Sequence, residues 1–463
     1  MTRTRPKVSF EIIDDSFVLP VESLLFAATK PIIACWAPDL HSIATPEELQ
    51  IGYMTETSQS NWFARVRLLS EHASGVSTAN SNYSSIVMQG VTGDGVTTGG
   101  AIGLLNGAYG TTYTIPMLSG ASGSTYTAGL SNEFRPNWWS VQNALQYGVT
   151  CRIGVAGIGF TSGGYNTSGT LSPLSTATDF AIPGLYDIIF QSFHNQSKAQ
   201  VVGDLTGWTG TTWNATASQT NVLNIVNALD DSERPVIGVL SVGLTGSVSS
   251  SANVGAASTT PNEFIVQVAG DKYHLNSIAN SSSSSLLRTH LAPDVAGCIA
   301  NTPYVWSSPA GTSRGRILNV VSLANKFTTT AQDVLYEENV NPVITIPGSG
   351  TVLYGDITNA EDTSSLVSIN VIRTIIFIKT SLLPIANEVM FELNDTSSRS
   401  AFTVRAEFIL RKILNAGGLS EFTVVCDESN NPQEIIDAKA FVADIKVKIP
   451  GSINYINISL TNQ

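Results

Sequence analysis

Hydrophobic and polar residues alternate at both ends of the chain, and this alternation predicts one β-strand near each terminus. The apolar positions are Val8, Phe10 and Ile12 in the first strand and Ile456, Ile458 and Leu460 in the last. Neither segment has a hairpin partner next to it in the sequence. A lone strand leaves amides and carbonyls unpaired along both edges, so each segment must join a sheet of its own subunit or of a neighbouring one.

Strand and helix patterns alternate in the middle of the chain. An apolar run over 26–37 predicts a strand, and Thr45 followed by Pro46 is typical of a helix start. Further helix or strand patterns cover 137–147, 150–156, 186–190, 221–229 and 235–240. This order predicts an α/β domain over 136–289, and the polyserine segment 281–285 is a plausible boundary.

The last part of the chain has the most regular patterns. Thr329 and Gln332 fit a capping box, and the apolar stripe of Arg399–Ala416 ends at a Gly-Gly pair. Residues 367–383 are so rich in Val, Ile and Leu that periodicity fits a buried helix and two buried strands equally. A half-buried strand follows, in which Ile445, Val447 and Ile449 alternate with Asp444, Lys446 and Lys448.

Residues 61–135 are rich in Gly, Ser and Thr, which suits either a disordered linker or short strands joined by long turns. Apolar anchors such as Ile86, Val87 and Leu104 favour the second interpretation, because a flexible linker lacks them. We therefore expect a β-rich surface domain here.

Composition narrows the function classes. Only 13% of the 463 residues are charged, well below the roughly 25% of a typical soluble domain, which suits a surface that packs against neighbours. The formal net charge of −12 and the lack of a Lys/Arg cluster argue against nucleic acid and favour a protein partner. No apolar run reaches about 20 residues, and no signal-peptide pattern follows Met1. We therefore expect that the protein is synthesised in a cytosol and does not insert directly into a membrane.

Candidate catalytic and metal-binding groups are scattered along the chain. None of the four cysteines has a Cys-x-x-Cys partner or a His at metal-ligand spacing, and all four are interpreted as buried thiols: Cys35, Cys151, Cys298 and Cys426. Glycines at 157, 159 and 163 partly fit a dinucleotide loop, but the residues that follow cannot easily begin the helix that such a loop requires. We expect no catalytic site, metal or cofactor; a dinucleotide-dependent oxidoreductase is the alternative from another class.

Four short motifs follow one another in the last third of the chain: Ser308–Arg316 (Ser-Pro-Ala-Gly-Thr-Ser-Arg-Gly-Arg), Leu335–Pro342, Phe391–Asp395 and Asp427–Pro432. Together, in this order, they resemble the C-terminal domain of contractile-tail sheath proteins, which polymerise around the tail tube of contractile bacteriophages. The resemblance covers residues 290–463, is fainter for 21–60 and around 138–155, and does not extend to 61–135.

The resemblance implies an α/β (α+β multidomain) fold with a mixed α/β sheath core. In that arrangement, 21–60 combine with 290–449 as the core domain, and 136–289 form the α/β middle domain. Residues 61–135 form an inserted outer domain, and the terminal segments 1–20 and 450–463 are strand-exchanging arms. The resemblance also favours a helix from about Asn370.

The function implied by the resemblance is that of a structural subunit in a contractile, myovirus-type tail sheath. Such a subunit assembles helically, in six-fold rings, and contracts to drive the tube through the host envelope during genome ejection. The implied partners are further copies of the chain, the tail tube protein, and the baseplate and tail terminator proteins. The implied location is the virion tail, assembled in the host cytoplasm. A phage-derived injection or secretion machine is an alternative with the same motifs.

Positively charged residues are the candidate interface groups. Arg314 and Arg316 fit salt bridges to a neighbouring subunit and a local clamp on acids of their own domain about equally. A basic surface facing the tube is a hypothesis for Arg405, Arg411, Lys412, Lys439, Lys446 and Lys448.

Overall fold

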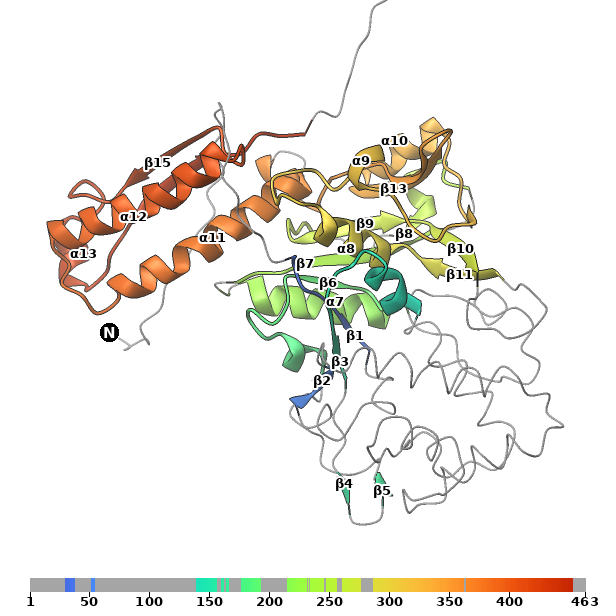
Figure 1. The fold of residues 1–463 in the computed structure, drawn as a ribbon, viewed down its shortest axis with the longest axis horizontal. Coiled ribbons are helices and arrows are strands. Elements are labelled where there is room, and N and C mark those ends of the chain that lie inside the picture. Colours follow the sequence, from blue (N-terminus) through green and yellow to red (C-terminus); the bar gives the residue numbers. More distant parts are fainter. Residues whose placement is uncertain are drawn as a thin grey trace, which may run out of the picture.

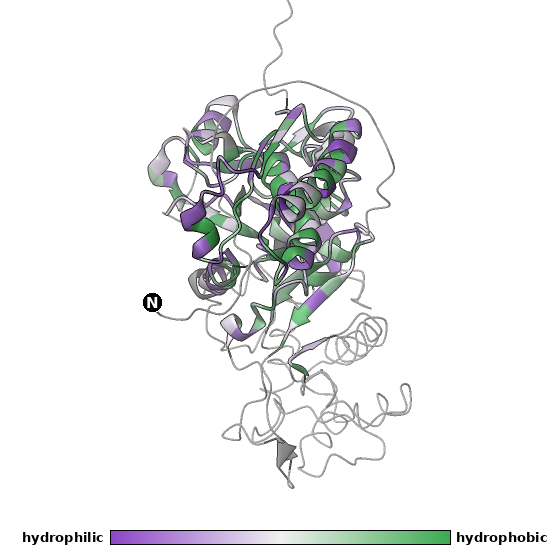
Figure 2. Ribbon diagram, turned by 90° about the vertical axis from the view of Figure 1, so that its left-hand side faces the viewer, coloured by the Kyte–Doolittle hydropathy of each residue, from purple (hydrophilic) through white to green (hydrophobic). Residues whose placement is uncertain are grey.

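The computed structural model describes residues 30–37, 51–54, 139–155, 160–161, 164–165, 176–192, 215–230, 232, 234–244, 247–255, 260–275, 286–361 and 364–452. The terminal strands, the helix start at Thr45 and the segment 61–135 lie outside these ranges. The described part consists of an α/β unit and, beside it, a smaller C-terminal unit of helices and a β-hairpin (Figure 1). Hydrophobic residues gather in the interior between the elements (Figure 2).

A nine-stranded sheet forms the centre of the α/β unit, in the order β14-β13-β9-β7-β6-β1-β3-β2, with β8 paired to β7. All neighbours from β13 to β3 are parallel, and their residues are almost all buried, as expected for a sheet covered on both faces. The strands are β1 Ile33–Trp36, β2 Tyr53–Met54, β3 Cys151–Gly154, β6 Ile188–Phe190, β7 Ile237–Leu244, β8 Val254–Gly255, β9 Ile265–Ala269, β13 Val340–Ile346 and β14 Gly350–Leu353.

Helices α7 (Ala215–Asp230) and α8 (Ala292–Asn301) pack on this sheet, together with the helical segment 139–145. The contact with α7 is close: a Cβ on Gly238 of β7 would lie 2.8 Å from Val226 of the helix. The smaller elements are β4 Phe160–Thr161, β5 Gly164–Tyr165, η4 Ala177–Phe180, η5 Ser251–Asn253, β10 Asp271–Leu275, β11 Leu286–His290, α9 Gly311–Arg314, β12 Ser322–Leu323, α10 Thr329–Glu337 and η6 Ser365–Val367.

The predicted elements of the middle region are confirmed: β1, β3, β6, α7 and β7 lie where the pattern places them. The predicted capping box at Thr329 and Gln332 is wrong by one residue: α10 begins at Thr329, but Thr328 is the N-cap, and its hydroxyl accepts from the Ala331 amide. The sheet also crosses the boundary expected at residue 289, since β9 pairs with β13. Residues assigned by pattern to two domains therefore share one sheet and one core.

The C-terminal unit is built from α11 (Ile369–Val389), α12 (Thr396–Asn415), the antiparallel strands β15 (Glu421–Val425) and β16 (Asp444–Lys448), and the short helix α13 (Gln433–Asp437). The open question for 367–383 is thus settled as a helix. Helix α12 ends at Asn415; Gly417, two residues on, has φ 80°, and the Gly418 amide donates to the Ile413 carbonyl.

Helix α11 belongs to two hydrophobic cores. Ile369 and Ile372 pack in the α/β unit, whereas Ile378 and Leu382 pack in the C-terminal unit. Within the described ranges α11 is the one helix long and apolar enough to span a bilayer, although the sequence pattern indicated no such run. More than half of that stretch is buried inside the protein, which is typical of a core helix.

A buried ion pair joins three segments of the α/β unit. Lys272 Nζ lies 2.7 Å from Asp294 Oδ1, both side chains are fully buried, and the amine also donates to the Leu318 carbonyl. The Tyr147 hydroxyl donates to the same carboxylate at 3.2 Å and accepts from the Leu318 amide. Burial raises the pKa of Asp294, and Lys272 opposes that shift. Beside the pair, the Tyr147 ring covers Gly297, where a Cβ would come within 2.3 Å of it.

We predict that Lys272→Met lowers the free energy of unfolding by about 3–5 kcal/mol, because it leaves the Asp294 carboxyl buried without its cation. The double variant Lys272→Met/Asp294→Leu should lose clearly less, since neither charge remains. Urea unfolding of the three proteins measures both values; a double variant as unstable as the single one would contradict this account.

His274 should make stability depend on pH. Its ring packs 4.8 Å from that of Trp139, and desolvation, helped by Lys272, lowers its pKa to about 4. In the unfolded chain this histidine binds a proton near pH 6.5, whereas in the folded chain it stays neutral until about pH 4. Its contribution to the free energy of unfolding is therefore complete above pH 6.5 and is lost as the pH falls toward 4. We expect a loss of roughly 3 kcal/mol over that window, which His274→Leu removes. Equal pH slopes for the two proteins in urea titrations would refute this assignment.

Candidate assembly surface

The C-terminal unit presents large apolar side chains to solvent. Phe391 and Leu393, in the loop between α11 and α12, are 85% and 79% exposed, and Val404 and Phe408 of α12 are 68% and 61% exposed. Groups this large are unusual on the surface of a monomer when they gather in one region, and such patches mark interaction sites. The unit is therefore the candidate contact surface.

The sequence of α12 explains why Val404 and Phe408 face outward. Phe402, Ala406 and Ile413 form the stripe that is buried against the hairpin and α11, as the pattern predicts. Val404 and Phe408 are four residues apart on the opposite side of the helix, so they cannot reach that core. We call this side, with Arg405, Arg411 and Lys412, the outer face of α12.

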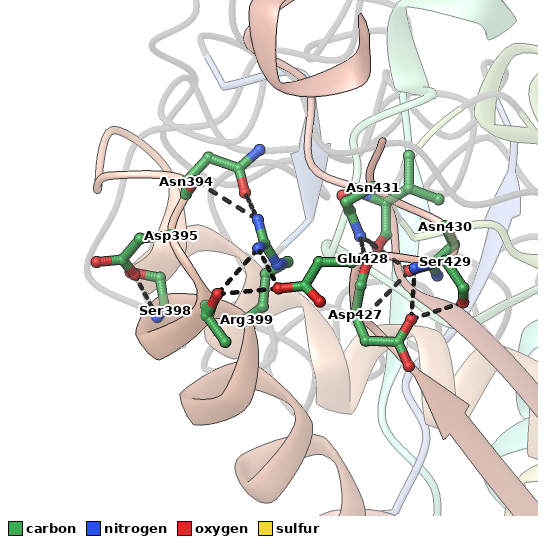
Figure 3. Close-up of polar contacts among 11 residues, drawn as sticks. Asn394, Asp395, Ser398, Arg399, Asp427, Glu428, Ser429, Asn430 and Asn431 are labelled. Atoms are coloured by element: carbon green, nitrogen blue, oxygen red, sulfur yellow. Dashed lines mark hydrogen bonds and ion pairs between the residues drawn. The ribbon is translucent and has the colours of Figure 1, made fainter. Parts of the chain in front are cut away.

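The two motifs Phe391–Asp395 and Asp427–Pro432 meet beside the N-terminus of α12, and Arg399 lies between them (Figure 3). The Arg399 guanidinium donates to Asn394 Oδ1 at 2.9 Å and lies 4.0 Å from the Glu428 carboxylate. Asn394 in turn donates to the Ala440 carbonyl at 2.6 Å. Asp395 caps α12 by accepting from the Ser398 amide, and this hydrogen bond lowers the pKa of its carboxyl.

Asn431 fixes the second motif from inside. Its side chain is buried, donates to the carbonyls of Asp427 and Val442, and accepts from the Val442 amide at 2.8 Å. Asp427 accepts from the amide and hydroxyl of Ser429, which lowers the pKa of its carboxyl. These contacts are local, so the carboxylates of this motif organise a loop and do not form a paired acid–base site.

The predicted basic residues of α12 lie on its outer face, but two of them have acidic partners. Arg405 pairs with Glu388 of α11, and Arg411 pairs with Glu407 one turn earlier at 3.0 Å. The Lys412 amine lies 4.2 Å from the centre of the Phe408 ring. The positive charge of this face is thus partly balanced within the subunit.

The basic residues of β16 lie away from the hydrophobic core of the unit. Lys446 is opposite Thr423, and Lys448 is opposite Glu421 on β15. Desolvation lowers the pKa of Lys448, and Glu421 opposes this shift. The structure therefore places seven of the eight predicted basic residues at three sites: near β14, on α12 and on β16. The eighth, Lys439, follows α13.

Arg314 and Arg316 lie at the edge of the large sheet. The Gly315–Ile317 backbone pairs with β14, through Leu353 to Gly315 at 2.7 Å and Ile317 to Thr351 at 2.9 Å. The Arg314 side chain donates to the Ser308 carbonyl, and both arginines are exposed. In the described part of the chain, neither arginine forms an ion pair with an acid of its own domain.

Chemically active groups do not assemble in the described residues. All four cysteines are buried and unpaired by disulfides, as predicted, and burial raises the pKa of the Cys298 thiol to about 12. The residues described contain no group of His, Cys, Asp and Glu suited to a metal. Glycines 157, 159 and 163 lie outside the described ranges, but β4 and β5 flank residue 163 as an antiparallel pair, where a dinucleotide loop requires a helix start.

Two protein-family models match the chain in succession. Residues 201–359 match the phage tail sheath protein central domain, and residues 361–461 match the phage tail sheath C-terminal domain. The chain belongs to the phage tail sheath family. The boundary between the two matches lies just before α11, the helix that joins the two cores.

Two curated relatives of this sheath-family protein are tail sheath proteins of phages. The one from Vibrio phage KVP40 is 42% identical over 172 residues, and the one from Enterobacteria phage T4 is 41% identical over 172 residues. Each match covers 36% of this chain and 26% of the relative. The chain therefore matches about a quarter of the length of these relatives.

Solved structures with the same fold include contracted sheaths. The extracellular contractile injection system "PVC sheath complex in contracted state" has a TM-score of 0.56, with 11% identity over 100% of this chain and 99% of that one. The helical sheath of the anti-feeding prophage in its contracted state has a TM-score of 0.54, with 13% identity over the full length of both chains. At these identities the likeness supports the fold alone.

Sequence patterns missed the exposed apolar side chains and the Arg399 contacts. A helical projection of the α12 sequence would have predicted that Val404 and Phe408 are exposed, because both lie opposite the buried stripe. Nothing in the sequence indicates that Arg399 of α12 reaches Asn394 of one motif and Glu428 of another.

We predict that Arg399→Ala lowers the free energy of unfolding of the C-terminal unit by about 2–4 kcal/mol, because a buried guanidinium with several hydrogen bonds is lost. The matched change Arg411→Ala removes an exposed pair and should alter stability by less than about 0.5 kcal/mol. Hydrogen exchange of residues 391–395 and 427–431 measures the effect. Similar exchange in both variants would show that Arg399 does not hold these loops.

Proposed function

We propose that this chain is a structural subunit of a contractile tail sheath, which polymerises helically around a tail tube and contracts to drive the tube through a host envelope. The observation that carries the proposal is the succession of two sheath-family matches over 201–461. The full-length likeness to contracted sheath structures supports the same fold. Its work is mechanical, and the subunit needs neither a catalytic site nor a cofactor for it.

Strand exchange by the terminal arms is the proposed link between subunits. The sheet β15–β16 has two strands, and in the described part of the chain no further strand pairs with either outer edge. An extended segment from a neighbouring copy can complete such an edge by main-chain hydrogen bonds. The alternating segments around Val8, Phe10 and Ile12, and around Ile456, Ile458 and Leu460, have the pattern that this requires.

The C-terminal arm would begin next to both cores. Asn370 of α11 donates to the carbonyls of Trp306 and Pro450, and the Ser452 hydroxyl donates to Asp356 at 2.6 Å. These contacts tie the end of the described chain to the α/β unit. We propose that 453–463 depart from this anchor toward a neighbouring subunit, and that 61–135 form an outer insertion.

The further proposed contacts are with the tail tube, the baseplate and the tail terminator, in a virion tail assembled in the host cytoplasm with six-fold rings. The basic residues of α12 and β16 are candidates for the tube side, and Arg314 and Arg316 for salt bridges between subunits. Arg314 and Arg316 are exposed and form no ion pair among the described residues, which favours that role for these two arginines.

A sheath of a phage-derived injection machine is the second candidate. It is favoured by the full-length likeness to sheaths of an injection system and of a prophage, whereas the higher sequence identity is to phage proteins. The genes beside that of this chain separate the two: capsid and terminase genes indicate a phage, and their absence beside tail genes indicates an injection machine.

Electron microscopy of the purified protein tests the proposal. We predict tubes from the full chain and dispersed, folded subunits from a variant without residues 1–19 and 453–463, because that variant lacks both donor strands. A variant that lacks only residues 1–19 is the control, because it keeps one of the two proposed donor strands. Folded monomers from the full chain at all concentrations and salt conditions would overturn the sheath proposal, and tubes from the double truncation would overturn strand exchange alone.

A further inference from the structure

Phe391 occupies a position that is unfavourable for an isolated subunit. Its backbone has φ 74°, a region that non-glycine residues rarely adopt, and its ring is 85% exposed. Left-handed backbone in such a residue costs about 1 kcal/mol or more, and the exposed ring adds no packing energy in return. Leu393, two residues on, is almost equally exposed.

The loop that carries these two side chains is held in place before any partner binds. Asn394 is fixed by Arg399 and by the Ala440 carbonyl, and Asp395 is fixed as the cap of α12. The Asp395 amide also donates to the Leu393 carbonyl at 2.9 Å. A rigid loop loses little conformational entropy on docking, so its apolar tips are suited to anchor an interface.

Charges of opposite sign surround the two apolar sites of the C-terminal unit. Around Phe391 and Leu393 the exposed charges are mainly the acids Glu392, Asp395 and Glu428; one exposed lysine, Lys439, precedes Ala440, whose carbonyl accepts from Asn394. Around Val404 and Phe408 the exposed charges include Arg405, Arg411 and Lys412, of which Lys412 lies on the Phe408 ring. The apolar site at Phe391 and Leu393 thus has a mainly acidic rim, and the apolar site at Val404 and Phe408 has a basic one. The two sites lie on the same polypeptide, and their rims are complementary in charge.

We propose that the 391–395 loop of one copy docks on the outer face of α12 of a second copy. Phe391 and Leu393 would cover Val404 and Phe408, with Glu392 and Glu428 facing Lys412 and Arg411. The two halves are different surfaces, so the contact is heterologous and can repeat without closing, as a helical polymer requires. The inference rests on the proposed sheath function and names a contact within it. The candidates for the tube-facing surface are then Lys439, Lys446 and Lys448.

A cysteine pair tests the contact directly. Full-length Phe391→Cys/Phe408→Cys protein is assembled and then oxidised. We expect a ladder of disulfide-linked multimers on a non-reducing gel, with at least about tenfold more linked chains than in the control. The control is Phe391→Cys/Val321→Cys, because Val321 is 54% exposed but lies in the α/β unit. Tubes without a ladder above the control would overturn the inference.

Charge reversal separates this contact from other uses of the same residues. Lys412→Glu and Glu392→Lys should each reduce the assembled fraction about tenfold with unchanged thermal melting, and the combination should restore it to within about threefold. Failure of the wild type to assemble would refute the sheath proposal and this contact with it. Unchanged assembly of both single variants would refute this contact only. If the single variants assemble normally but no longer bind purified tail tubes, the outer face of α12 contacts the tail tube, and the proposal is overturned.

Discussion

The arrangement of the described chain depends on one helix that is shared by two hydrophobic cores. The first turns of α11 are packed under the α/β unit, and its later turns are packed against α12 and the hairpin. A helix whose two halves pack in different cores cannot bend or slide without opening one of them. Three buried polar side chains reinforce this. Asn370 donates to the Trp306 carbonyl, Lys379 donates to the Ser232 carbonyl, and Arg373 interacts electrostatically with Asp187.

This constraint gives the C-terminal unit a fixed position relative to the α/β unit. The unit is small, and it presents strand edges with which no other described strand pairs, exposed apolar side chains and charges of both signs. Its loops are nevertheless held by buried polar contacts, notably those of Arg399 and Asn431. A polymer that changes shape by moving subunits as rigid bodies needs contact surfaces of this kind, which keep their form while their neighbours move.

Sequence patterns predicted the elements well where one face of each element is buried. The strands near 150, 186 and 235 and the helices α7 and α12 follow from periodicity alone, whereas α11 needed the family resemblance because it is apolar on nearly all sides. Long-range contacts were beyond such patterns. The pairing of β9 with β13 and the ion pair of Lys272 and Asp294 bring together segments that are distant in the sequence. Local composition does not predict which distant segments come into contact.

A helical reconstruction of assembled full-length protein by cryo-electron microscopy tests the central claim most directly, since the claim concerns contacts between copies. The account predicts density for additional strands along the edges of β15 and β16, contributed by neighbouring subunits, in a tube of open helical symmetry. A tube in which β15–β16 remains two-stranded, with each subunit's terminal segments folded on itself, would contradict it.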